Sequence, residues 1–451
     1  MSNRIRFLRT FCLAVAISCL GAAPRLSSSE TLPSGTFLIK NVRIFDGSRV
    51  IPEDSVLVKD GRIEKLGKNL VVPAGVPVVD GSGNTLLPGL IDAHVHSYIR
   101  AALQQELLFG VTTELDMDDD PSFAIPIQKL QAAGKERDTA DIITSGWAAT
   151  CPGGHGTEGA TIKIPTLSKP DEAQAFVDAR IAEGSNYIKI IYDAGSWIGR
   201  PMPSLDKPTM KALIEAAHKR GKMAVVHIGT YAAAMDAVNA GADGIVHLFI
   251  DQAPGPDFGR TLAARRMFAI GTLTVLQAEI TATGVSLAAD PDLAPYLTEH
   301  SAARLRESLV NYLKPGHPEL KLEYADGAVR QLVAAGVPVL AGTDAPNPGT
   351  FYGISLHREI ELLVEASMTP VQALAAATSI PAGVFKLGDR GRIAKGLRAD
   401  LLLVKGDPTR DILNTRKIVG IWKLGTTVDR EALKGSWEKA FEEYNKKDAK
   451  R

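Results

Sequence analysis

The sequence is poor in cysteine and has no excess of either charge. Its three cysteines are Cys12, Cys19 and Cys151, and the first two fall in an apolar N-terminal segment. Without that segment a single thiol remains, which excludes an internal disulfide. Lys plus Arg and Asp plus Glu each number 51. This balance, with no run of Lys or Arg, argues against nucleic acid as a partner. Stability must therefore come from core burial, for which a 45% hydrophobic chain is adequate.

Two kinds of catalytic motif are also missing. The sequence contains no Gly-x-Ser-x-Gly elbow, and no glycine-rich loop is followed by Lys-Ser or Lys-Thr. Serine or cysteine nucleophile chemistry and nucleotide binding are therefore disfavoured.

The N-terminus has the pattern of an export signal. Arg4, Arg6 and Arg9 precede an apolar run over 11–23. The run is too short for a comfortable membrane span, so we expect a signal peptide over 1–29 and no stable membrane insertion. The protein is predicted to be secreted or periplasmic. Lipoprotein anchoring at Cys19 is the alternative.

The middle of the chain predicts an α/β fold. Short apolar strands alternate with helical segments over 87–385, which favours a TIM-type (β/α)8 barrel. Four of the intervening helices are predicted at 171–183, 207–220, 232–240 and 324–335. The predicted strands are 90–96, 111–117, 141–147, 187–193, 223–228, 244–249, 269–275 and 338–344.

Both chain ends predict further strands. Segments 30–86 and 386–428 are both strand-like, and the first contains Asp-Gly turn pairs. We expect the two segments to form one small β-sandwich module. Residues 429–451 are charged and predict a surface helix and tail.

Four histidines and one aspartate fall at or near strand ends, and one lysine lies within a strand. His94 and His96 are two residues apart on one strand, so both point to the barrel interior. His227, His247 and Asp344 belong to strands five, six and eight. Barrel active sites are built at the carboxyl ends of the strands, and imidazole is the usual ligand of zinc-like metals.

Lys189 lies inside the apolar fourth strand. Burial beside cations disfavours its charged form. A neutral lysine can react with carbon dioxide to give a carbamate, whose two oxygens can bridge two metals. The site then keeps a small net positive charge, which suits a developing oxyanion.

Several motifs resemble the amidohydrolase superfamily, in particular its imidazolonepropionase-like and Xaa-Pro dipeptidase-like branch. They are Pro88-Gly89-Leu90-Ile91-Asp92-Ala93-His94-Val95-His96, Tyr187-Ile188-Lys189-Ile190 and Gly342-Thr343-Asp344-Ala345. The resemblance implies two divalent metal ions, with zinc as the default. His94, His96 and Asp344 would hold one, His227 and His247 the other, and N6-carboxylated Lys189 would bridge them. It also implies that a metal-bridging hydroxide is the nucleophile and that Asp344 moves the proton to the leaving amine.

The loops suggest further site residues. His155 lies in the glycine-rich segment 152–156, where related amidohydrolases place a histidine near the substrate, so we assign it a catalytic or substrate-binding role. Substrate contacts are also expected from Tyr192, Trp197, Arg200 and Tyr352. His218, His300 and His317 are expected at the surface, and His357 is expected to be structural. The four aspartates of 116–121 are interpreted as a solvated loop.

The sequence thus predicts a metal-dependent hydrolase of a C–N amide bond in a dipeptide, an N-acyl amino acid or a similar small molecule. A lactone, a carbamate or an organophosphate ester is an alternative substrate for the same metals. A non-catalytic scaffold is a weaker alternative, because all six ligands are retained. The resemblance leaves a homo-oligomer open.

Overall fold

The computed structural model describes residues 32–71, 74–158, 162–281 and 284–448. The fold below is that of the unit that begins at Pro33. The predicted signal peptide and Cys19 lie outside the described residues. Among the described residues, no helix combines the length and apolar composition that a bilayer crossing requires.

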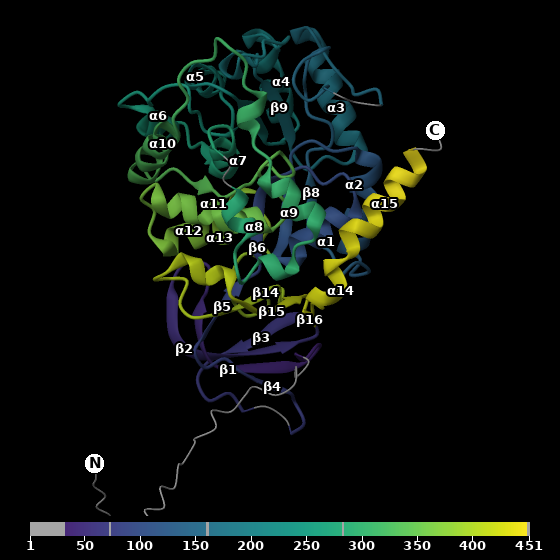
Figure 1. The fold of residues 1–451 in the computed structure, drawn as a ribbon, viewed down its shortest axis with the longest axis vertical. Coiled ribbons are helices and arrows are strands. Elements are labelled where there is room, and N and C mark those ends of the chain that lie inside the picture. The colour runs from purple at the N-terminus through teal and green to yellow at the C-terminus, as the bar shows by residue number, and fades with distance from the viewer. Residues whose placement is uncertain (1–31, 72–73, 159–161, 282–283, 449–451) are drawn as a thin grey trace, which may run out of the picture. The chain divides into compact units, whose positions relative to one another are not determined.

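Strands from both chain ends form one sheet (Figure 1). Its order is β16-β15-β14-β5-β1-β2-β3, with β4 on the side of β1. A tight turn joins β2 to β3, and both turn residues, Asp60 and Gly61, have positive φ as a type I′ hairpin requires. The strands are β1 (Phe37–Phe45), β2 (Val50–Lys59), β3 (Arg62–Leu66), β4 (Val78–Asp80), β5 (Asn84–Pro88), β14 (Leu401–Lys405), β15 (Ile418–Lys423) and β16 (Thr426–Thr427).

Eight parallel strands lie between these ends, in a three-stranded and a five-stranded sheet. The first contains β6 (Leu90–Val95), β7 (Val111–Asp116) and β8 (Asp141–Thr144). The second contains β9 (Ile188–Tyr192), β10 (Ala224–Ile228), β11 (Gly244–Val246), β12 (Phe268–Ile270) and β13 (Val339–Leu340). Parallel bridges link the two sheets at both edges, Val95 to Ala345 and Ala149 to Ile190. The strands therefore follow one another from β6 to β13 and back to β6.

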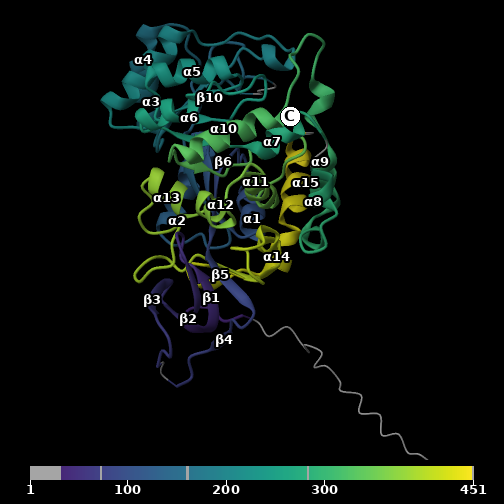
Figure 2. The ribbon, with the colours of Figure 1, turned by 90° about the vertical axis from the view of Figure 1, so that its left-hand side faces the viewer.

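Helices connect these strands, and in Figure 2 α3, α4 and α5 lie at the end away from β1–β4. Caps fix several helix ends: the Asp206 side chain accepts the Thr209 N–H before α4, and α5 ends at the left-handed Gly241. The α-helices are α1 (Arg100–Leu108), α2 (Pro121–Ala132), α3 (Ala173–Glu183), α4 (Lys207–Lys219), α5 (Tyr231–Ala240), α6 (Phe258–Ala264), α7 (Leu273–Ala278), α8 (Gly284–Ala288), α9 (Glu299–Arg306), α10 (Leu322–Ala334), α11 (Ile354–Glu365), α12 (Pro370–Ala376), α13 (Ser379–Val384), α14 (Arg430–Lys434) and α15 (Ser436–Asp448). Short 3₁₀ turns are η1 (Pro170–Glu172), η2 (Ser196–Ile198), η3 (Ala294–Tyr296), η4 (Leu309–Tyr312) and η5 (Ile412–Arg416).

Three sequence expectations need correction. The strand predicted at 269–275 ends at Ile270, because Thr272 adopts a left-handed φ of 47° and α7 begins at Leu273. A short buried apolar run does not distinguish strand from helix. The end module is one continuous sheet rather than the two hydrogen-bonded sheets of a sandwich, since β14 pairs with both β5 and β15. The C-terminal segment forms two helices, and Trp437 on α15 is buried against Phe351 and Tyr352.

Candidate metal centre

The first predicted ligands meet where β6 approaches the segment after β13. Nε2 of His94 lies 3.2 Å from Nε2 of His96. Oδ1 of Asp344 lies 3.3 Å and 3.1 Å from these two atoms. His94 is fully buried, whereas the side chain of His96 is 18% exposed. One carboxylate oxygen and two imidazole nitrogens therefore face one point.

The motif residues around this point hold β6 close to the segment that carries Asp344. Asp92 accepts N–H groups from His94 and Thr343 and the Thr343 hydroxyl, at 3.0, 3.1 and 2.7 Å, which ties β6 to the segment that carries Asp344. At Gly342 a Cβ would lie 2.9 Å from His94 Cβ, so only glycine permits this approach. Asp344 itself has a φ of 57°. Such strain in a non-glycine residue is typical of functional sites.

The second pair of histidines lies next to the first. Nδ1 of His227, on β10, lies 2.9 Å from Nε2 of His247. The His247 ring is 4.8 Å from the His94 ring, centroid to centroid. His247 also has a positive φ, 68°. Its Nδ1 is 2.7 Å from the Thr272 hydroxyl, which leaves Nε2 facing His227.

Lys189 completes the cluster from β9. Its side chain is buried, and Nζ lies 3.5 Å from Nε2 of His94. Burial lowers the pKa of Lys189 to about 8, although Asp344, Asp118 and Asp116 act in the opposite direction. The six predicted ligands thus form one contiguous cluster, from strands that are distant in sequence.

The donor set fits divalent cations. Ligand atoms of His94, His247 and Asp344 all lie within 4.8 Å of one another. Burial, followed by the neighbouring charge of Lys189, holds the pKa of His94 well below its ordinary value, so its imidazole is neutral and able to ligate. Imidazole and carboxylate donors suit zinc and related ions. The residues therefore fit the metals implied by the resemblance.

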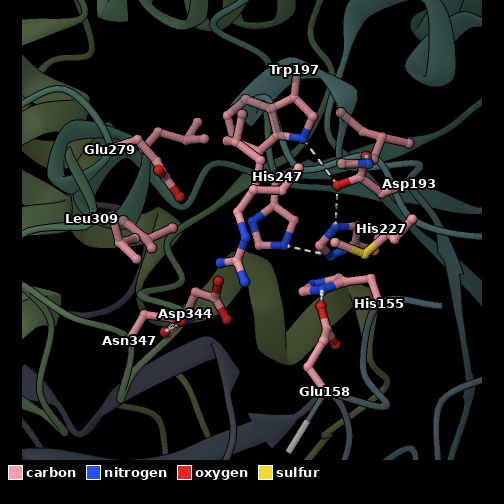
Figure 3. Close-up of a pocket in the computed structure, with 17 residues that line it drawn as sticks. His155, Glu158, Asp193, Trp197, His227, His247, Glu279, Leu309, Asp344 and Asn347 are labelled. Carbon is pink, nitrogen blue, oxygen red and sulfur yellow. Dashed lines mark hydrogen bonds and ion pairs between the residues drawn. The ribbon is translucent and has the colours of Figure 1, made fainter. Parts of the chain in front are cut away.

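A pocket of about 170 Å³ opens beside this cluster (Figure 3). His155 lies over His227 with ring centroids 4.9 Å apart, and its Nδ1 is 2.9 Å from Oε1 of Glu158. The pocket is lined by His155, Glu158, Asp193, Gly195, Trp197, Ile198, Arg200, Met202, His227, Ile228, His247, Val275, Leu276, Glu279, Leu309, Asp344 and Asn347.

The structure brings three of the five predicted substrate residues to this pocket: His155, Trp197 and Arg200. The other two point elsewhere. The Tyr192 hydroxyl donates to Asp236 on α5, and the Tyr352 hydroxyl donates to the carbonyl of His96. Tyr352 therefore does not line the pocket. Its ring is buried against Trp437, and its hydroxyl holds the backbone of His96 just after β6.

Sequence reasoning missed several polar residues of the site. Oδ2 of Asp193 lies 3.6 Å from Nε2 of His227 and accepts the Trp197 indole N–H at 3.0 Å. Glu158, Glu279 and Asn347 also line the pocket. All four lie in loops or at a helix end, where no periodic pattern marks them. The one available signal was that Asp193 ends the segment predicted as strand four.

The interpretation of 116–121 as a solvated loop was wrong. Asp116 and Asp119 are buried, and Asp118 accepts the backbone N–H of Ala148 at 2.9 Å. Asp118 also lines a second cavity with His96 and Lys189. Composition suggested solvation, but the loop folds inward because Thr144 donates to the Asp116 carboxylate.

The remaining histidines lie away from the cluster. His218 pairs with Asp243 at the surface, and His317 is half-buried, with Nδ1 2.6 Å from the carbonyl oxygen of Pro318. His300 is only half-buried and its ring stacks beside Trp437, so it is not a plain surface residue. His357 is buried, and its two ring nitrogens contact Thr415 and the carbonyl of Phe109, which makes it structural.

Comparison with known proteins identifies the family. The model of the Amidohydrolase family matches residues 85–429, which is most of the chain. The chain belongs to the amidohydrolase family. Among its relatives is the imidazolonepropionase of Cereibacter sphaeroides, 27% identical over 386 residues, which cover 81% of this chain and 92% of the relative. The prediction of an amidohydrolase, an enzyme that hydrolyses carbon–nitrogen bonds, is thereby confirmed, as is the imidazolonepropionase-like branch.

Solved structures of the family have the same fold. A Xaa-Pro dipeptidase with methionine bound in its active site is 22% identical, with a TM-score of 0.68 over 88% of this amidohydrolase and 100% of that chain. Phenylurea hydrolase B is also 22% identical, with a TM-score of 0.68 over 88% and 98%. These likenesses imply a TIM-type barrel with an additional domain.

Proposed function

We propose that this amidohydrolase is a metal-dependent enzyme that cleaves the amide bond of a dipeptide, an N-acyl amino acid or a similar small molecule. The observation that carries the proposal is the contiguous cluster of His94, His96, Lys189, His227, His247 and Asp344. We also infer that β6–β13 close into a (β/α)8 barrel, because bridges join the two parallel sheets at both edges. The cluster then lies where barrel enzymes build their sites.

In this proposal, His94, His96 and Asp344 would hold one divalent cation and His227 and His247 would hold the second. Lys189, once carboxylated, would supply carbamate oxygens as further ligands. When bound, such cations lower the pKa of a coordinated water to about 7 and polarise a carbonyl oxygen. Zinc is the expected ion for these donors.

The chain's own residues supply the proton movements. Asp344 faces the cluster with Oδ1 and accepts a proton from the attacking water, which it then donates to the leaving amine. His155 is held at Nδ1 by Glu158, so its Nε2 is the atom available to the substrate carbonyl. Apolar side chains around the pocket reduce the access of bulk water.

The cleavage of carbon–nitrogen bonds is supported by relatives whose names describe such substrates, an imidazolonepropionase and a Xaa-Pro dipeptidase. The same metals would act on a lactone, a carbamate or an organophosphate ester. A substrate panel therefore needs these classes beside dipeptides and N-acyl amino acids.

The test combines this panel with metal analysis of Lys189→Ala. We expect the wild type to bind two metal ions per chain and to hydrolyse amides. The variant should lose activity by at least about a thousandfold, because a group that positions both ions and the nucleophile is removed. Lys65→Ala, on an exposed strand position, is the matched control. A metal-free wild type, or an unimpaired Lys189→Ala, would refute the assignment.

We also propose that the chain is exported and loses residues 1–29. The basic residues Arg4, Arg6 and Arg9 before the apolar run support this. N-terminal sequencing of the mature protein checks it, and an intact Met1 would contradict it.

A further inference from the structure

The pocket beside the metal cluster contains two charged side chains that nothing neutralises. Glu279 follows α7 and Arg200 follows η2, and both line the pocket. In the described part of the chain, neither side chain forms an ion pair or a hydrogen bond. The two groups still interact electrostatically, because the charge of Arg200 lowers the pKa of Glu279. A carboxyl group and a guanidinium thus line one small cavity, separated by more than ion-pair distance.

The other carboxylates of the pocket are already engaged. Asp193 accepts from the indole of Trp197 and from the N–H of Gly195, and Glu158 is bound to His155. Asp344 belongs to the predicted metal ligands. Glu279 is therefore the carboxylate of this pocket that has its hydrogen-bonding capacity free, and in Figure 3 its carboxylate points into the cavity.

Glu279 is half-buried, so a ligand that covers its carboxyl group must supply a hydrogen-bond partner. Burial, and next the charge of Asp344, raise the pKa of Glu279 to about 7. An ammonium group in contact with Glu279 would restore its ionised form and form a charge-assisted hydrogen bond.

Arg200 is exposed and extends from a tightly turned loop. Its N–H donates to the carbonyl of Gly195 at 2.9 Å. Gly195 and Gly199 both have positive φ, and a Cβ at either would lie 2.3 Å from a backbone oxygen. This turn directs the backbone of Arg200 back toward the pocket that its side chain lines. A planar guanidinium is suited to a carboxylate.

The wall between these charges is apolar. It consists of Trp197, Ile198, Met202, Val275, Leu276 and Leu309. With a volume of about 170 Å³ and this apolar wall, the cavity suits a small molecule with an aliphatic side chain.

We propose that Glu279 and Arg200 select a zwitterionic substrate, with its ammonium group at Glu279 and its carboxylate at Arg200. Among the small amides considered above, a free dipeptide with an aliphatic side chain carries both charges, whereas an N-acyl amino acid lacks the ammonium group. This inference rests on the proposed function and narrows it.

Four matched compounds test the pairing: alanyl-leucine, N-acetyl-leucine, alanyl-leucinamide and N-acetyl-leucinamide. Alanyl-leucine carries both charges, N-acetyl-leucine the carboxylate alone, alanyl-leucinamide the ammonium group alone and N-acetyl-leucinamide neither. In the metal-loaded protein, Glu279→Gln should lower kcat/KM for alanyl-leucine about ten- to hundredfold, the usual effect of losing a charge-assisted hydrogen bond. N-acetyl-leucine should change less than about threefold, because it makes no such bond. Arg200→Gln should lower kcat/KM for alanyl-leucine similarly and leave alanyl-leucinamide unchanged.

Controls and a binding measurement separate the outcomes. Glu64→Gln and Arg330→Gln, at exposed positions, should leave every rate unchanged. Calorimetric titration of chelator-treated protein with alanyl-leucine should give a weaker affinity for Glu279→Gln than for wild type, even without turnover. If Glu279→Gln affects alanyl-leucine and N-acetyl-leucine equally, or the wild type prefers N-acetyl-leucine, the zwitterion proposal is overturned while amide hydrolysis stands. If the wild type cleaves no amide, the proposed function fails instead.

Discussion

At the residue scale, His227 and His247 are the predicted ligands of the second metal ion, and a polar neighbour orients each ring. The Thr272 hydroxyl binds Nδ1 of His247, and Asp193 faces Nε2 of His227. The opposite nitrogens, Nε2 of His247 and Nδ1 of His227, then lie 2.9 Å apart. Partners of this kind orient the ring and set its tautomer, so Asp193 is a positioning residue for His227.

Replacing Asp193 by Asn tests this role. Asn retains an oxygen that can accept from Trp197, but it removes the negative charge beside His227. We expect the second metal ion to bind about ten- to hundredfold more weakly, with the first ion little changed. Competition with a chromogenic chelator measures both affinities. Asp236→Asn is the matched control, since Asp236 accepts the Tyr192 hydroxyl outside the pocket. Equal effects of the two variants on metal affinity would contradict the assignment.

The sequence was informative for site residues that end strands. His94, His96, His227 and Asp344 follow buried apolar runs, so their convergence could be predicted from topology alone. The place of Glu279 could not be predicted in this way. It follows helix α7, and the first residues of α7 were predicted to belong to a longer strand. Its place in the pocket depends on the left-handed turn at Thr272, and no local sequence pattern marks that turn.

At the element scale, the number and order of parallel strands were predictable but their lengths were not. Strands β11, β12 and β13 are two or three residues long in the structure, although apolar runs of six or seven residues predicted them. After each strand, the chain bends to present a residue such as His247 or Asp344 at positive φ. The bend that follows each short strand therefore places these residues in the site.

The C-terminal helix α15 contributes Trp437 to the core. Trp437 packs on Phe351 and Tyr352, with ring centroids at 5.2 and 5.4 Å, and is 8% exposed. We expect Trp437→Ala to destabilise the fold by about 3 kcal/mol, the lower end for truncating a large aromatic core residue. Urea denaturation gives the free energy of unfolding. Trp437→Phe should recover more than half of the loss, and a variant as stable as wild type would show that α15 is only a surface helix.

At the scale of the whole molecule, a buried ion network joins the end sheet to the parallel strands. Asp141, at the start of β8, lies 2.6 Å from Arg390, 2.8 Å from Arg398 and 3.0 Å from Lys423 on β15. Asp400 also pairs with Arg398, at 2.9 Å. Lys423 is fully buried. The C-terminal part of the end sheet is therefore tied by charge to the parallel strands.

The network predicts how stability depends on pH. Burial alone would raise the pKa of Asp141, but Lys423, Arg398 and Arg390 outweigh it and hold the pKa well below the ordinary value. A carboxyl group whose pKa is depressed on folding stabilises the fold above its unfolded pKa of about 3.9. That contribution is lost as the pH falls through the folded pKa.

Asp141→Asn should therefore destabilise the protein by about 3–5 kcal/mol at pH 7, because it leaves buried cations short of an anion. Asp389→Asn is the matched control: its carboxylate also pairs with Arg390 but is 44% exposed, so about 1 kcal/mol or less is expected. Urea midpoints of chelator-treated protein, measured from pH 7 to pH 3, exclude loss of metal as the cause. The difference between wild type and Asp141→Asn should be constant down to about pH 4 and narrow below it, as the carboxyl group of the unfolded wild type becomes protonated while that of the folded state stays ionised. A difference that is small at pH 7, or that widens in acid, would mean that the network is held by packing rather than by charge.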